Sequence, residues 1–278
     1  MAPQTRSGQK ASAAKPNSKD TKPKAETAGA KRKRKDQPED KTGSSATEAG
    51  EENEPPAKKP EIDHKKASSD KLDKILLKYG TVPLSDLGLE SPTEPTPETV
   101  LAHLLNAMLT SARISHELAT KTVKEVFKAN YHHLDILKKS SWQERTEVLT
   151  DGGYTRYREK TATALGELAD LISDKYHSDL NFLREKADDS PDKIRKLVKE
   201  VKGFGDVGVN IFCDSAQAIW PSLAPFIDPR SLQTAKQLGL GNDVDKLYAA
   251  VGKDPLKMAQ LCTALTTIRL DKREAEFE

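Results

Sequence analysis

The segment VKGFGDVGVN, residues 201–210, constrains the fold of this chain more than any other stretch. It places Gly203, Gly205 and Gly208 in the spacing G-x-G-x-x-G, which in a dinucleotide-binding fold follows a β-strand and opens a helix. Glycine also permits a tight turn between two helices and a close approach of the backbone to a ligand. The residues that flank the glycines therefore decide between a sheet and a helical turn.

The residues on both sides of the glycines have helical spacing. Before them, apolar residues recur at i, i+3, i+4 and i+7: Ile194, Leu197, Val198 and Val201. Six charged residues interrupt the same stretch from Asp192 to Glu200, which is not typical of a buried parallel strand. After the glycines, Phe212, Ala216 and Ile219 repeat the helical spacing. We therefore predict a helix, a tight glycine turn and a second helix, and we reject a dinucleotide site.

The chain from Ser69 onward favours helices elsewhere too, with a first helix over about residues 71–80. Capping residues predict further helix starts at the following places: Thr96-Pro97, Ser115, Ser141 with Glu144, Ser190-Pro191, Asp228-Pro229, Asp243 and Asp254-Pro255. No stretch of four or more residues shows the β-branched alternation of a strand. The predicted fold class is all-α.

Residues 1–69 differ from the rest of the chain. They hold no Phe, Trp or Tyr and almost no branched aliphatic residue, so they cannot bury enough apolar surface to offset the entropy of ordering, and we predict disorder. About 16 Lys and Arg against about 11 Asp and Glu make this tail basic and leave the remainder at about −3. The tail contains five consecutive cations: Lys31, Arg32, Lys33, Arg34 and Lys35. Such a run predicts a nuclear-import signal, and no apolar run predicts a membrane span.

Four segments, in order and at their separations, resemble the endonuclease III-like, helix-hairpin-helix (HhH-GPD) DNA glycosylases. These are LLNAMLTSARISHELATKTVKEVF (104–127), GGYTRYREKTATALGELADLI (152–172), VKGFGDVG (201–208) and PFIDPRS (225–231). The third resembles the hairpin of that family, and the fourth places Asp228 where the family keeps its catalytic aspartate. Together they span about 125 residues.

The resemblance implies a two-lobed helical protein, with lobe A at about 99–220 and lobe B at about 71–98 plus 221–278. It implies a monomer that binds double-stranded DNA, extrudes one damaged nucleotide and encloses it between the lobes for base-excision repair. The enzyme would be a hydrolase of the N-glycosidic bond, and Asp228 would stabilise the cationic sugar of the transition state. An aspartate before a proline is also a good N-cap, and the two roles are compatible.

The resemblance assigns DNA contacts to a set of residues in and near the hairpin: Gly203, Phe204, Gly205, Val207, Gly208, Lys202 and Arg113. Val207 stands at the position of the lysine that forms a Schiff base in bifunctional relatives, so covalent catalysis by that route is excluded. Lys202 stands where proline is usual, and Asp206 puts an acid directly after the hairpin. Arg113 stands where relatives place a glutamine that fills the gap in the duplex; the alternative is an exposed arginine at a helix end.

The cofactor expectation also follows from the resemblance. Many relatives hold an iron–sulfur cluster with four cysteines near the C-terminus, but only Cys262 lies in that region, so we expect no cluster and no metal ligand set. A monovalent cation at the hairpin is compatible with the pattern. Cys213 and Cys262 are expected to be buried apolar groups.

Three functions follow from these observations. The first is a nuclear, monofunctional DNA N-glycosylase with Asp228 as its key acid. The second is a helix-hairpin-helix DNA-binding protein without catalysis, which Val207, Asp206 and the acidic folded part favour. The third is a helical interaction domain with a basic arm.

Overall fold

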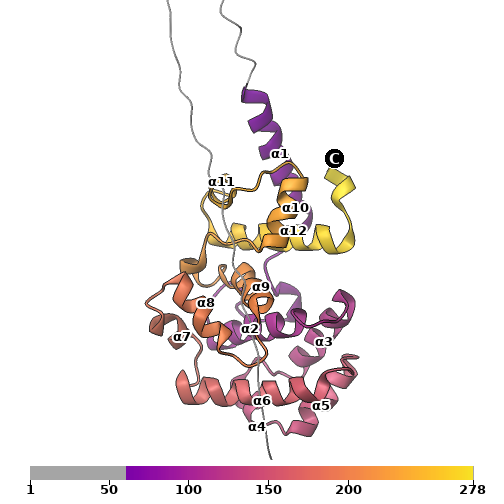
Figure 1. The fold of residues 1–278 in the computed structure, drawn as a ribbon, viewed down its shortest axis with the longest axis vertical. Coiled ribbons are helices and arrows are strands. Elements are labelled where there is room, and N and C mark those ends of the chain that lie inside the picture. The colour runs from indigo at the N-terminus through magenta and orange to yellow at the C-terminus, as the bar shows by residue number, and fades with distance from the viewer. Residues whose placement is uncertain (1–60, 278) are drawn as a thin grey trace, which may run out of the picture. The chain divides into compact units, whose positions relative to one another are not determined.

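Helix-forming signals in the sequence set the elements of the structure. A computed structural model describes residues 61–277, and in them every regular element is helical (Figure 1). The α-helices are α1 (Glu61–Tyr79), α2 (Pro97–Thr110), α3 (His116–Lys128), α4 (Leu134–Lys139), α5 (Trp142–Asp151), α6 (Arg158–Lys175), α7 (Asn181–Lys186), α8 (Pro191–Lys199), α9 (Asp206–Ala216), α10 (Pro229–Gln237), α11 (Val244–Ala250) and α12 (Pro255–Asp271). Three short 3₁₀ helices are η1 (Ser85–Leu87), η2 (Pro221–Leu223) and η3 (Glu274–Phe277). The predicted all-α fold class is confirmed for this part of the chain.

Side-chain caps explain where several of the helices begin. The Ser115 side chain accepts from the N–H of Leu118 at the start of α3. Ser141 and Glu144 form the predicted capping box at the start of α5, in which each side chain accepts from the other's backbone N–H. Asp254 caps α12 directly before Pro255. These helix starts are confirmed as predicted.

The first helix begins earlier than the sequence indicates. Helix α1 starts at Glu61, whereas the sequence predicts the first helix at about residues 71–80. The first part of α1 lacks apolar periodicity, and periodicity alone does not detect such a stretch. The predicted import signal at residues 31–35 lies outside the residues that the structure describes. Helices α4 and α7 were not predicted, since each has only six residues.

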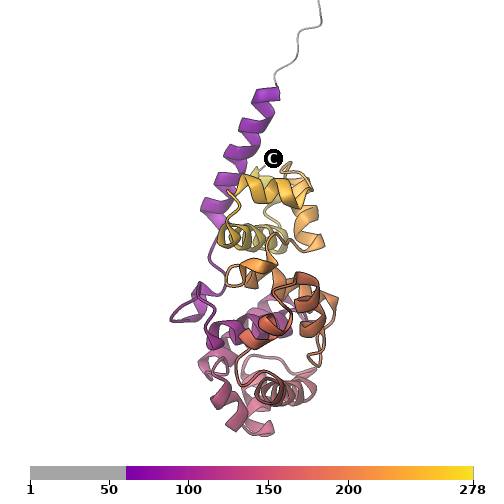
Figure 2. The ribbon, with the colours of Figure 1, turned by 90° about the vertical axis from the view of Figure 1, so that its left-hand side faces the viewer.

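The buried side chains form two separate hydrophobic cores. The first core lies among α2 to α9 and η2, and includes Phe212 and Trp220. The second core lies among α1, α10, α11 and α12, and includes Ile75 and Leu265. Helix α1 packs on α12, which lies near the other end of the chain, and α9 contacts α12 across the two cores (Figures 1 and 2). The elements around the first core are called the first lobe below, and the elements around the second core are called the second lobe.

The segment around η1 lies in a different lobe from the one expected. The sequence assigns residues 71–98 to the second lobe, whereas Leu84, Leu87 and Leu89 pack against the first core. This stretch is broken by proline and glycine, so it has no apolar period that predicts its partner.

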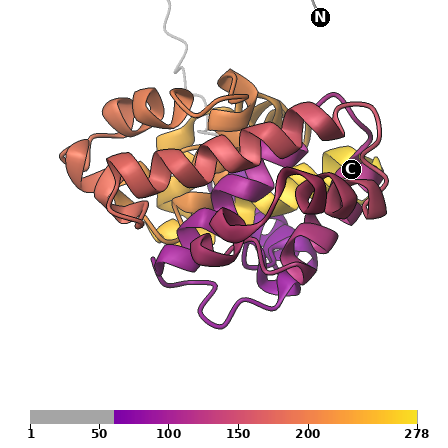
Figure 3. The ribbon, with the colours of Figure 1, turned by 90° about the horizontal axis from the view of Figure 1, so that it is seen from below.

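Helix α6 supports the far side of the first lobe. Viewed from below, it runs across the face of that lobe, with α4 and α5 packed beside it (Figure 3). Arg145 on α5 donates from Nε to the carbonyl oxygen of Ala162 on α6 over 2.9 Å. The hairpin helices α8 and α9 lie on the opposite side of this lobe, toward the second core (Figure 1).

Candidate functional site

Helices α8 and α9 meet at a short turn, residues 200–205, and form a helical hairpin. Gly203 has a φ of +93°, which a residue with a Cβ rarely adopts, so the turn requires glycine there. Gly205 is the N-cap of α9 and has no side chain to accept a hydrogen bond. The first intrahelical bond runs from the N–H of Val209 to the carbonyl of Gly205 over 3.1 Å, which leaves the N–H groups of residues 206–208 free at the helix end. These groups and the helix dipole favour an anion.

The other two glycines serve different purposes. A Cβ on Gly208 would lie 3.0 Å from Cδ1 of Phe204 and 3.2 Å from Oγ of Ser111, so this glycine lets α9 pack closely on the end of α2. A Cβ on Gly205 would meet no atom within 4 Å, and its φ of −105° is open to any residue. Neither strain nor internal packing explains glycine at position 205.

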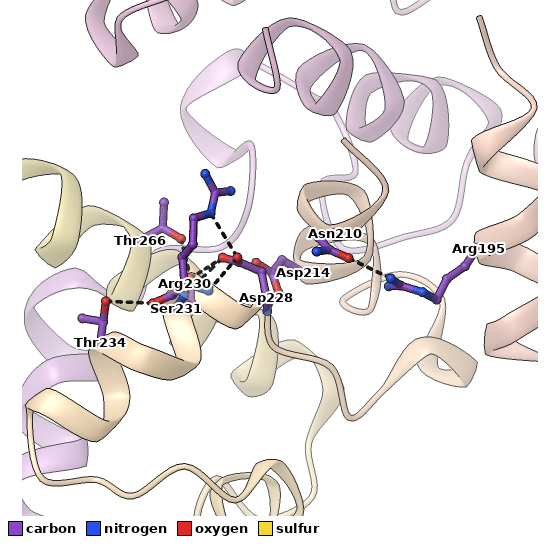
Figure 4. A network of polar contacts seen from close by, with 8 residues as sticks. All are labelled: Arg195, Asn210, Asp214, Asp228, Arg230, Ser231, Thr234 and Thr266. Carbon is purple, nitrogen blue, oxygen red and sulfur yellow. Dashed lines mark hydrogen bonds and ion pairs between the residues drawn. The ribbon is translucent and has the colours of Figure 1, made fainter. Parts of the chain in front are cut away.

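One arginine holds the two hairpin helices together. Arg195 on α8 donates from Nη2 to Oδ1 of Asn210 on α9 over 2.7 Å (Figure 4). Its Nη1 lies 3.5 Å from Sγ of Cys213. Its guanidinium also lies 4.8 Å from the ring centroid of Phe226, two residues before Asp228. The hairpin is therefore fixed with respect to the segment that carries Asp228.

Asp228 is the N-cap of α10 and is only 3% exposed. Its Oδ1 accepts from the N–H of Arg230 over 2.9 Å and from Nε of Arg230 over 3.2 Å. Its Oδ2 accepts from the N–H of Ser231 over 3.3 Å and from the Ser231 hydroxyl over 2.8 Å. Burial by itself raises the pKa of Asp228, but these hydrogen bonds and the charge of Arg230 outweigh it, so the pKa lies below its usual value. The carboxylate is buried and ionised.

Asp214 on α9 is a second buried acid beside Asp228. Its Oδ1 accepts from the backbone N–H of Asp228 over 2.8 Å, and Figure 4 shows the two side chains next to each other. Burial, followed by the negative charge of Asp228, raises the pKa of Asp214 well above its usual value. Their surroundings therefore separate the pKa values of the two acids and favour the ionised form of Asp228 and the protonated form of Asp214.

Both acids line one cavity of about 500 Å³. Its walls come from the end of α2, from α3, from the start of α9 at Val207, and from α12 between Cys262 and Leu270. First-lobe and second-lobe residues thus enclose it together. The volume lies within the roughly 300–1,000 Å³ that small-molecule sites occupy.

The residues to which the sequence assigns DNA contacts differ in their exposure and in their contacts. The Phe204 side chain is 7% exposed and belongs to the first core, so a DNA contact of Phe204 would use its backbone. Val207 is 46% exposed and lines the cavity. Lys202 is exposed and its Nζ lies 2.5 Å from Oε1 of Glu167. Arg113 is exposed just after α2.

The acid that follows the hairpin has a partner on the other hairpin helix. Asp206 is exposed, and its Oδ1 accepts from Nζ of Lys199 over 2.5 Å. This hydrogen bond and the lysine charge lower the pKa of Asp206. The lysine therefore balances the negative charge at the free end of α9.

The sequence did not predict the residues around Asp228. Arg230 and Ser231 share its carboxylate, and Thr266 on α12 lies 3.1 Å from the Ser231 hydroxyl. Since Ser231 donates its proton to Asp228, Thr266 is the donor in that contact. Asp214 did carry a signal, because it is the one charged residue between Val207 and Trp220. A single acid in an otherwise uncharged, largely buried helix marks a candidate site.

The two cysteines lie close to this site and are both buried, as predicted. Burial raises the pKa of Cys213 to about 12 and also raises the pKa of Cys262. Both are therefore thiols at neutral pH and not nucleophiles.

Comparisons with known proteins return no relative for this chain: no protein-family model, curated protein or solved structure matches it. Among the side chains that the structure describes, no three from His, Cys, Asp or Glu come together as a metal site. None of the helices described is long and apolar enough to cross a bilayer.

Proposed function

We propose that this protein is a monofunctional DNA N-glycosylase of base-excision repair. The observation that carries the proposal is the position of Asp228, a buried and ionised acid on the wall of a cavity that begins at the end of the glycine hairpin. The resemblance of four sequence segments to endonuclease III-like glycosylases supports it. The expected residence is the nucleus, because of the run Lys31–Lys35, and the expected partner is double-stranded DNA.

The hairpin would hold the DNA backbone near the cavity. A phosphate would accept from the free N–H groups of residues 206–208. This contact needs no large positive charge, and the folded part of the chain carries a net negative charge. The absence of a Cβ at Gly205 allows the phosphate to approach the backbone. An extruded nucleotide then reaches the cavity between the lobes.

Asp228 would stabilise the positive sugar that forms when the base leaves. The bond between C1′ and the base nitrogen breaks first, with its electron pair on the base, and water then attacks C1′. A fixed carboxylate at that sugar lowers the barrier because it need not reorganise. Val207 has no amine, so the reaction ends at an abasic site without a Schiff base.

The DNA-binding protein without catalysis is the second candidate. Four donor contacts from Arg230 and Ser231 occupy the Asp228 carboxylate, which fits a purely structural N-cap. This candidate keeps the hairpin as the DNA contact and needs no chemistry in the cavity.

A panel of duplex oligonucleotides tests the proposed activity. Each duplex carries one damaged or mismatched base, and the full chain is expected to release at least one of these bases and leave an abasic site. Alkali should then cleave the strand, while untreated product stays intact and borohydride traps no protein on the DNA, because no lysine stands at position 207. Salt-dependent binding without release from any duplex would favour the second candidate, and absence of binding would favour an interaction domain.

Alanine at the hairpin glycines separates DNA contact from turn geometry. Gly205→Ala is expected to lower the free energy of unfolding by about 1 kcal/mol, because alanine is a poorer N-cap than glycine although it causes no strain or clash here. Its Kd for duplex DNA should rise roughly tenfold or more, since the new methyl group faces the phosphate. Urea unfolding and a fluorescence binding titration measure the two effects.

Two other glycines are the controls for this experiment. Gly203→Ala, with a φ of +93°, should cost about 1–2 kcal/mol of stability. Gly252→Ala, with a φ of +79° in the loop between α11 and α12, should cost a similar amount and leave the Kd for DNA unchanged. Unchanged DNA affinity in Gly205→Ala would contradict a phosphate contact at this residue.

A further inference from the structure

The two carboxyl groups at the cavity wall have unlike partners. Asp228 receives four hydrogen-bond donor contacts and the charge of Arg230. Asp214 receives one backbone N–H on Oδ1 and is 8% exposed. Burial with so few donors favours the neutral form of this acid, and its proton then sits on Oδ2, because Oδ1 accepts from the N–H of Asp228.

The charged and titratable groups around Asp214 come from several helices. Asp228 and Arg230 belong to the start of α10, Cys262 and Arg269 belong to α12, and Cys213 precedes Asp214 on α9. The Arg230 guanidinium is committed to the Asp228 carboxylate, and both cysteines are neutral thiols. Burial first, and then the charge of Asp228, therefore favour a neutral acid at Asp214.

We propose that Asp214 is the proton donor for the departing base, in a reaction that rests on the proposed glycosylase function. When the C1′–N bond breaks, its electron pair goes to the base nitrogen and Asp214 gives its proton to the base. Water then forms the new bond to C1′ and gives its proton to Asp228. Asp228 returns that proton to Asp214 through water before the next turnover, so the net reaction is hydrolysis.

A buried acid with a raised pKa costs the fold stability at neutral pH, and an uncharged residue in its place would avoid this cost. Its folded-state pKa is raised, so its contribution to stability is complete below its unfolded pKa of about 3.9 and is lost as the pH rises toward the folded value. An asparagine keeps an oxygen that accepts the N–H of Asp228 and never ionises. Asp214→Asn is therefore expected to have a higher Tm than the natural chain at pH 7–8, and a smaller advantage at pH 4.

Leaving-group acidity tests the proton transfer. A base that the natural chain releases is compared with a version that carries an electron-withdrawing ring substituent, which leaves without needing a proton. In single-turnover experiments, Asp214→Asn should slow release of the unsubstituted base on the order of 100-fold. The factor by which it slows release of the substituted base should be at least ten times smaller. Asp228 acts on the sugar and not on the base, so Asp228→Asn should slow release of the two bases by the same factor.

The pH profile is a second readout of the same step. The natural chain should lose its rate on the unsubstituted base as the pH rises through the raised pKa of Asp214, and the Asn variant should show no such decline. An equal loss for both bases, no loss, or release of only those bases that are already cationic would overturn the role of Asp214. Failure of the natural chain to release any base would instead reject the proposed glycosylase function.

Discussion

Asp228→Asn is expected to lower the single-turnover rate of base release by roughly 10²–10⁴-fold. In the proposed reaction, the change removes the negative charge that would face the developing cation of the sugar. It preserves the N-cap, because asparagine caps a helix about as well as aspartate. The variant should therefore fold and bind duplex DNA as the natural chain does, and lose only the chemical step. Quantifying the released base against time with protein in excess measures that step.

Asp254→Asn is a matched control for this result. Asp254 is also an N-cap directly before a proline, and its Oδ1 accepts from the N–H groups of Leu256 and Lys257. It does not line the cavity. Its replacement should change the rate by less than about twofold, since only a cap is altered. A rate within tenfold of the natural value in Asp228→Asn would assign Asp228 to helix capping alone.

Trp220→Ala is expected to destabilise the fold by about 3–5 kcal/mol, the largest stability effect that we predict. Trp220 is fully buried, meets Phe212 edge-on with ring centroids 5.5 Å apart, and donates from Nε1 to Oδ1 of Asn181 over 3.0 Å. Asn181 in turn donates to the carbonyl of Pro95 over 2.7 Å, so the indole ties three distant segments together. Urea unfolding should show the loss, with a Tm lower by roughly 10 °C.

The second tryptophan of the chain is the control. Trp142 is 46% exposed and donates to the hydroxyl of Thr163 at the surface. Trp142→Ala should therefore cost less than about 1 kcal/mol. Similar losses for the two variants would mean that the first core does not depend on the contacts of Trp220.

Local signals predicted much of the fold. The helix starts at Ser115, Ser141 and Asp254 follow from capping chemistry, which depends on residues one to three positions away. The apolar spacing on both sides of Gly203 predicted the hairpin. Asp228 as an N-cap followed from its proline neighbour.

The rest of the site depends on contacts between distant segments. The raised pKa of Asp214 depends on burial and on the negative charge of Asp228, which distant segments bring to it. The cavity exists because α12 faces the ends of α2 and α9. Apolar periodicity does not predict which helices face each other. The inward packing of the Phe204 side chain also depends on the first core, because an aromatic side chain next to a core is more stable when it is buried.

The packing of α1 on α12 affects how the chain folds as it is synthesised. The Lys71 ammonium donates to the carbonyl of Leu238, 167 residues further along, and Leu72 and Ile75 share a core with α12. At about 5–20 residues per second, a ribosome needs roughly ten to thirty seconds to supply those partners. The apolar stripe of α1 therefore stays exposed to water until α12 has been made, while the first lobe can assemble before it. A chaperone that covers this stripe would act on the nascent chain until α12 leaves the ribosome.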